Sequence, residues 1–164
     1  MVHSAPAHDP GRSGVSWGTF VREAPDLADQ VRERFEAHSQ HVLATLTIIG
    51  SPRVSGASVG WWRDELWIAA PPGSHKARDL RADARLALHS NPGDGTVGDA
   101  RVGGLAVDLV GGDARDDLLA HSGLAASTDV FLVRLRTVRS TAPVVEHGPL
   151  ETSRWRSGHG AHEH

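Results

Sequence analysis

The chain has 164 residues, of which 39% are hydrophobic and 23% are charged, and its net charge is −3 at neutral pH. This length and composition are ordinary for one globular domain with a single core. There is no cysteine, which excludes disulfides, thiolate metal sites and cysteine-based catalysis. The slightly acidic charge argues against a nucleic-acid partner, because sequence-independent binding needs a concentrated basic face.

The two ends of the chain differ in composition from its middle. Residues 1–15 are rich in His, Pro, Gly and Ser and carry no periodicity, so we expect a flexible arm. Residues 159–164 contain three histidines, but a floppy terminus offers no preorganised geometry, so we expect a disordered tail and no metal site. The folded domain is then residues 16–158. Because no secretion signal and no apolar run of ~18 residues is present, we expect a cytoplasmic protein without a membrane partner.

The first half of the domain predicts one helix and three strands. Pro25 suits the first turn of a helix, and Leu27, Val31 and Phe35 form one apolar stripe, which predicts a helix over 25–39. Alternating residues predict strands over 42–48, 53–62 and 65–70. The second of these strands contains four small residues at 55–58, which leave space beside the backbone for a flat ligand or a second subunit.

Residues 71–90 are the most informative stretch. Two prolines and Gly73 break the third strand, and Ser74 is a favoured N-cap for a short helix that follows it. A helix start places free N–H groups and the positive end of the helix dipole beside Ser74, His75 and Lys76, which suits a phosphate. Lys76 is the only lysine among the 17 basic residues. The alternative is an ordinary capped helix in a chain whose codon usage favours arginine.

The helix after Ser74 also carries Arg78 and Arg81 with Asp79 between them, a pattern that predicts a solvated face. Further strands are expected over 84–90, 99–110 and 130–138, with a helix over 113–121 and a pair of strands at 142–145 and 150–155. Six or seven strands, mostly in hairpin order, predict a mainly β fold with helices (α+β): an antiparallel barrel with an N-terminal helix and a short helix after its third strand.

Two motif matches are rejected on context. Residues 93–98 spell G-x-G-x-x-G, but the chain continues as a strand where a dinucleotide site needs a helix. Residues 56–60 spell G-x-S-x-G around Ser58, but a strand and hairpin follow where a nucleophile elbow needs a sharp turn and a helix. Ser58 is therefore not expected to be a nucleophile.

The chain resembles the pyridoxamine 5′-phosphate oxidase-like flavoproteins, in particular small actinobacterial-type members, in the order of its elements and in six short segments. The segments are residues 42–46, 50–55, 65–67, 73–80, 84–90 and 155–158. The resemblance implies a split barrel and a homodimer with the cofactor in a cleft between subunits. The implied cofactor is FMN or, in some branches, the deazaflavin coenzyme F-420.

By position, the resemblance implies eight cofactor-binding residues. The flavin phosphate would be held by Arg53, Ser74, His75 and Lys76. The ring and ribityl chain would lie near Ser58, Ala69 and Ala70, and Trp155 of the partner subunit would flank the ring. The family commonly has arginine where His75 stands. Oxidases proper also carry a lysine or polar residue near Ser58 and an arginine soon after the final Trp-Gly segment, where this chain has residues 159–164. Because this cationic partner for a substrate phosphate is missing, true pyridoxamine-phosphate oxidation is not expected.

Three functional hypotheses follow. The first is an FMN- or deazaflavin-dependent oxidoreductase acting on a small organic substrate, in which the cofactor carries the redox chemistry. The second is a non-catalytic dimer that binds flavin or haem as a carrier or sensor. The third is a structural dimer whose ligand site has decayed. No side chain is a compelling acid or base, and His89, at a strand end, is the nearest candidate.

Overall fold

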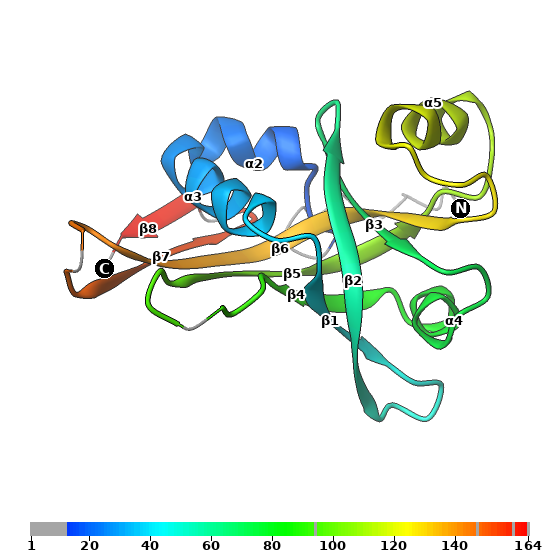
Figure 1. Cartoon of the computed structure of the whole chain (residues 1–164), viewed down its shortest axis with the longest axis horizontal. Coiled ribbons are helices and arrows are strands. Elements are labelled where there is room, and N and C mark those ends of the chain that lie inside the picture. The colour runs from blue at the N-terminus through cyan, green and yellow to red at the C-terminus, as the bar shows by residue number, and fades with distance from the viewer. Residues whose placement is uncertain (1–12, 94, 147, 159, 164) are drawn as a thin grey trace, which may run out of the picture.

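The structure is a computed structural model that describes residues 13–93, 95–146, 148–158 and 160–163. Figure 1 shows a strongly curved sheet with two helices, α2 and α3, toward one end and two others, α4 and α5, toward the opposite end. The helices are α2 (Trp17–Glu23), α3 (Pro25–Glu36), α4 (His75–Ala82) and α5 (Asp113–Ser122). The strands are β1 (His41–Leu46), β2 (Pro52–Trp62), β3 (Glu65–Ala70), β4 (Arg85–His89), β5 (Asp99–Asp108), β6 (Asp129–Pro143), β7 (Leu150–Arg156) and β8 (Gly160–Glu163).

Six of the strands close into an antiparallel barrel. Their order is β3-β2-β1-β4-β5-β6, and pairing between β3 and β6 closes the ring. The 15-residue strand β6 is long enough to serve two partners along one edge, with β3 opposite its first residues and β7 opposite its last. Strands β7 and β8 extend the sheet beyond the closed barrel. The structure confirms the antiparallel split barrel and the short helix after the third strand.

A β-bulge in β6 lies opposite Gly103 and Gly104 of β5, with Arg136 as the extra residue. The register between β5 and β6 shifts between Gly103 and Gly104. A Cβ on Gly104 would lie 2.2 Å from the carbonyl oxygen of Arg134, so only glycine lets the two backbones approach this closely. Bulges of this kind increase the local twist and bend of a strand.

Helices α2 and α3 cover the barrel interior. The apolar stripe of α3 is buried as its spacing predicts, with Val31 and Phe35 almost fully excluded from solvent. The helix ends at Glu36 rather than near residue 39. Helix α2 was not predicted; it is only seven residues long, and the Ser16 hydroxyl caps it by accepting from the Thr19 N–H at 3.2 Å.

Helix α5 covers a separate patch on the outer face of β2, β3 and β6. Its Leu118 and Leu119 join a buried cluster that also contains Trp62, Trp67, Ala69, Val130 and Leu132. Within this patch the indole of Trp67 lies over Gly60, where a Cβ would come within 2.2 Å of the ring. The glycine therefore makes room for the tryptophan on the neighbouring strand.

The two ends of the chain are partly described. Residues 1–12 of the expected arm lie outside the described residues. The Val15 N–H donates to the Leu135 carbonyl of β6 at 2.9 Å, and the Leu135 N–H donates to the Val15 carbonyl at 2.8 Å. At the other end, residues 160–163 form β8 on the open edge of β7, which offers unpaired backbone groups. Residues 159 and 164 of the expected tail lie outside the described part. No helix that the structure describes is long and apolar enough to cross a membrane.

Candidate cofactor site

The start of α4 has the geometry that its sequence predicts. The Ser74 hydroxyl accepts from the Ala77 N–H at 3.4 Å, and the Ser74 N–H donates to the Pro71 carbonyl at 3.1 Å. The N–H groups of His75 and Lys76 belong to the first turn, so the helix itself offers them no acceptor. With the helix dipole, these two groups place hydrogen-bond donors and partial positive charge at this end of α4.

The turn before α4 is tied to strand β6. The Gly73 N–H donates to a carboxylate oxygen of Asp129 at 2.9 Å, and Arg81 donates to the other Asp129 oxygen at 2.8 Å. Arg81 also donates to Asp108 at 2.6 Å. The hydrogen bonds from Arg81 hold the pKa of Asp129 below its ordinary value despite partial burial. The N-terminal end of α4 is therefore fixed in place by a charged network.

One expectation about α4 was wrong. Asp79 does not belong to a solvated face: its side chain is 8% exposed and accepts from Arg53 Nε at 2.7 Å and from the Thr45 hydroxyl at 2.8 Å. Burial alone raises the pKa of Asp79, but the hydrogen bonds from Arg53 and Thr45, with the charge of Arg53, outweigh it and leave the pKa below its ordinary value. The ionised carboxylate therefore positions the Arg53 guanidinium beside α4.

Lys76 extends from α4 to β2, the strand that also carries Arg53. Its Nζ donates to the Gly56 carbonyl of β2 at 2.5 Å. The Nη atoms of Arg53 make no hydrogen bond to any other residue that the structure describes, and the Arg53 side chain is 35% exposed. His75 is exposed, with its Nδ1 3.1 Å from a guanidinium nitrogen of Arg78. The structure therefore brings Arg53, Ser74, His75 and Lys76 together.

The other expected contact residues lie at the edges of this cluster. Ser58 and Ala69 are paired on β2 and β3, and Ala69 belongs to the cluster beneath α5. Ala70 faces the opposite side, into the barrel core. The Ser58 hydroxyl accepts from the Gln40 amide at 3.0 Å, and the Gln40 oxygen lies over Gly56. Gln40 thus covers part of the small-residue segment, and it must move aside for a ligand to contact that backbone.

Trp155 lies apart from the α4 cluster within this chain. It is on β7, is 2% exposed, and its indole N–H donates to Glu23 at 2.9 Å. Its ring packs against Phe20 of α2 at a centroid distance of 4.9 Å. In a single chain Trp155 is a core residue, so its expected place beside the ring of a partner's cofactor stays a prediction.

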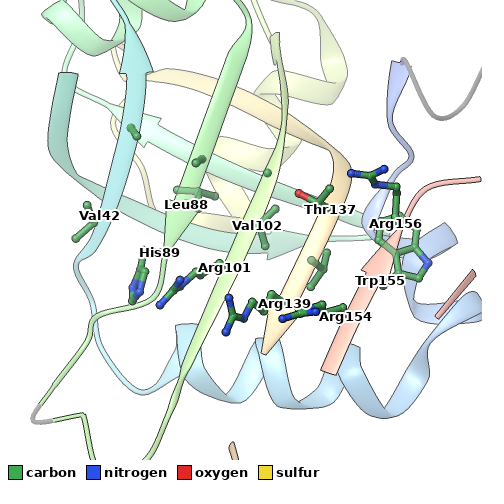
Figure 2. Close-up of a pocket in the computed structure, with 14 residues that line it drawn as sticks. Val42, Leu88, His89, Arg101, Val102, Thr137, Arg139, Arg154, Trp155 and Arg156 are labelled. Carbon is green, nitrogen blue, oxygen red and sulfur yellow. The ribbon is translucent and has the colours of Figure 1, made fainter. Parts of the chain in front are cut away.

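A groove of about 740 Å³ runs along the outer face of β1, β4, β5, β6 and β7 (Figure 2). Val42, Ala44 and Ala87 contribute an apolar floor, whereas His89 and several arginines stand along it. His89 is held by a contact of 2.6 Å between its Nδ1 and the Ser90 carbonyl oxygen. The groove begins at Val42, which is paired with Gly56, the residue that Lys76 contacts.

The sequence model for the pyridoxamine 5′-phosphate oxidase family matches residues 27–142. The chain belongs to this family. The matched segment runs from α3 to the end of β6, so it contains the whole barrel and the α4 cluster. No curated protein matches the chain.

Solved structures of low sequence identity share the fold of this oxidase-family chain. A candidate pyridoxamine 5′-phosphate oxidase from Listeria innocua has a TM-score of 0.59 at 13% identity, over 68% of this chain and 95% of the other. A haem-binding protein from Mycobacterium smegmatis has a TM-score of 0.55 at 19% identity, over 77% and 57%. An F-420 reductase has a TM-score of 0.51 at 20% identity, over 65% and 94%.

The residues around α4 fit a phosphorylated cofactor. Arg53 offers its Nη atoms, Ser74 a hydroxyl, and the first turn of α4 two backbone N–H groups, while Lys76 stands beside them. Arg53 and Lys76 together outweigh the single negative charge of Asp79. Such donors recognise a phosphate through charge-assisted and neutral hydrogen bonds.

Proposed function

We propose that this chain is an FMN-dependent oxidoreductase that acts on a small organic substrate. The observation that carries the proposal is the α4 cluster, in which Asp79 of α4 holds Arg53 beside the helix whose N-terminal end presents Ser74 and Lys76. A charge-assisted hydrogen bond to a phosphate is worth roughly 1.5–3 kcal/mol. Two such contacts, together with the first-turn N–H groups, support the proposal that a phosphorylated ligand binds tightly here.

The cofactor and the protein would have different roles in the reaction. Bound FMN supplies hydride or electron-pair transfer, and the chain supplies binding, orientation and exclusion of water. The roles proposed for this chain's residues follow that division. Arg53, Ser74, His75 and Lys76 bind the phosphate, and the backbone of Ser58, Ala69 and Ala70 borders the ring or ribityl chain.

We also propose that the working unit is a cytoplasmic homodimer with a cofactor in each cleft between subunits. The support is the family to which the chain belongs and the position of Trp155 on β7, which lies outside the closed barrel. In the dimer the Trp155 of one subunit would flank the cofactor of the other. Multi-angle light scattering on the purified protein tests this point, and a monomer with bound FMN would contradict it.

The experiment that tests the cofactor is a visible absorption spectrum of the purified protein before and after adding FMN. Heat-released ligand is identified by mass spectrometry in the same preparation. We expect flavin bands that shift on binding. A protein that neither carries FMN nor takes it up would refute the proposal.

Two relatives in fold define what to titrate next in that case. One is named an F-420 reductase and one a haem-binding protein. Uptake of the deazaflavin coenzyme would agree with a phosphate site at the α4 cluster, but the redox cofactor would then be the deazaflavin and not FMN. Uptake of haem with no turnover would favour a carrier or sensor.

A further inference from the structure

The register of the sheet places basic side chains in one row across the groove. Arg101 of β5 is directly opposite Arg139 of β6, and Arg139 is directly opposite Arg154 of β7. His89 of β4 is opposite Arg101 and continues the row toward β1. Figure 2 shows these four side chains side by side on one face of the sheet. Like charges directly opposite each other destabilise a sheet.

The protein itself offers little to balance this row. Within the described part of the chain, no residue that lines the groove is acidic. The nearest carboxylate is that of Asp99, whose Oδ2 is 2.9 Å from Arg101 and 3.4 Å from His89. No described residue accepts a hydrogen bond from the buried Nε of Arg139. Arg154 is exposed, and neither Arg139 nor Arg154 is ion-paired with a described residue, so both side chains carry charge that an external anion can balance.

The next row along the strands has the opposite character. Its members are small: Ala44, Ala87, Gly103 and Thr137 lie opposite one another in turn. Arg156 on β7 ends this row opposite Thr137. A row of small residues forms a flat shelf beside the arginines, and the groove volume of about 740 Å³ is within the usual range for small-molecule sites.

We propose that this groove binds a flat organic anion that carries two or more carboxylate or phosphate groups. The body of the ligand lies on the small-residue shelf, and its anionic groups receive charge-assisted hydrogen bonds from Arg101, Arg139 and Arg154. Neighbouring strands are ~4.8 Å apart, so the row favours anionic groups separated by about that distance. A single anionic group can engage only part of it.

The position of the groove also gives it a role. Its β1 end adjoins Gly56, which Lys76 of the α4 cluster contacts. A ligand that extends from the arginines on β5, β6 and β7 to the β1 end of the shelf would therefore adjoin the proposed cofactor. This makes a polyanionic organic molecule the substrate class, and this assignment of role, unlike the binding itself, rests on the proposed function. None of the groove-lining residues except Trp155 belongs to the expected cofactor set.

Isothermal titration with benzene-1,3,5-tricarboxylate tests the binding. This flat trianion separates its carboxylates by about one strand spacing, and benzoate serves as the matched monoanion. We expect the trianion to bind more tightly than benzoate, and higher salt to weaken it because the contacts are ionic. Arg139→Gln and Arg154→Gln should each weaken trianion binding about 10-fold, the loss of roughly one charged contact.

Three controls make the result decisive. Arg63→Gln removes an exposed arginine paired with Asp117 outside the groove, and it should leave the affinity unchanged. Lys76→Ala should weaken FMN binding but not trianion binding. Thermal unfolding of Arg139→Gln checks folding, and relief of repulsion in the row predicts no loss of stability.

Three outcomes would overturn the proposal that the groove binds the anion. The first two are no trianion binding at millimolar concentration, and binding that the Arg139 and Arg154 variants leave unchanged. Binding lost in Lys76→Ala alone would move the anion to the α4 cluster and also overturn it. A protein that binds the trianion but no FMN would keep the groove and refute the proposed function. The two failures are therefore distinguishable.

Discussion

The ion pair between Asp79 and Arg53 predicts a pH-dependent loss of stability in Asp79→Asn. The substitution keeps the shape of the side chain and removes its negative charge. In the native chain the Oδ2 atom of Asp79 lies 2.7 Å from Arg53 Nε and also accepts from the Thr45 hydroxyl. The variant leaves the Arg53 guanidinium with a neutral amide in place of its ionic partner.

The magnitude follows from the exposure of the two side chains. Breaking a fully buried ion pair costs roughly 3–5 kcal/mol, whereas an exposed pair contributes about 0–1 kcal/mol. Asp79 is 8% exposed, but Arg53 is 35% exposed and partly screened by water. We therefore expect the free energy of unfolding to fall by about 2 kcal/mol, which for a chain of this length lowers the melting temperature by about 4–8 °C.

The sign of the pH dependence follows from the pKa of Asp79. Folding lowers this pKa, because the hydrogen bonds and charge of Arg53 outweigh the effect of burial. The stabilising contribution is therefore fully present above the unfolded-state pKa of ~3.9 and is lost as the pH falls through the folded-state pKa. The difference between native chain and Asp79→Asn should be constant from pH 7 to 5 and shrink below about pH 4.

Urea unfolding followed by tryptophan fluorescence measures this difference, since the chain has five tryptophans. Asp83→Asn is the matched control, because its partner Arg85 has a side chain that is 64% exposed. We expect the control to lose far less stability at pH 7. Equal losses in the two variants, or a loss from Asp79→Asn that is the same at pH 3 as at pH 7, would refute the reasoning.

Three further substitutions test the cofactor site and the packing. Lys76→Ala should weaken FMN binding roughly 10-fold in a fluorescence titration through loss of one charged contact, and an unchanged affinity would remove Lys76 from the site. Gly60→Ala should cost about 1–3 kcal/mol in urea unfolding, because its Cβ would overlap an indole ring, whereas Gly111→Ala, with nothing within 4 Å, should be tolerated; equal effects would contradict the packing. Trp155→Phe leaves the Glu23 carboxylate without its donor and should lower the unfolding free energy by about 1–3 kcal/mol; a variant as stable as the native chain would show that this bond contributes nothing.

The sequence predicted the local parts of this protein because their causes are local. Alternation along β1–β3 identified the strands, and the apolar stripe of α3 identified the helix. Ser74 follows a proline-glycine break, so its capping role and the start of α4 could be located without knowing the fold. The hairpin order of the strands then restricted the possible barrel topologies to a few.

The tertiary structure alone decided which charges meet. Asp79 looked like one more charge on a polar helix, and its burial against Arg53, 26 residues away, depends on how α4 docks onto β1 and β2. The arginine row arises from the register of three strands, and a slip of one residue in any of them would turn its arginine to the other face. Spacing along the chain encodes neither docking nor register, because both are set by contacts between residues distant in sequence.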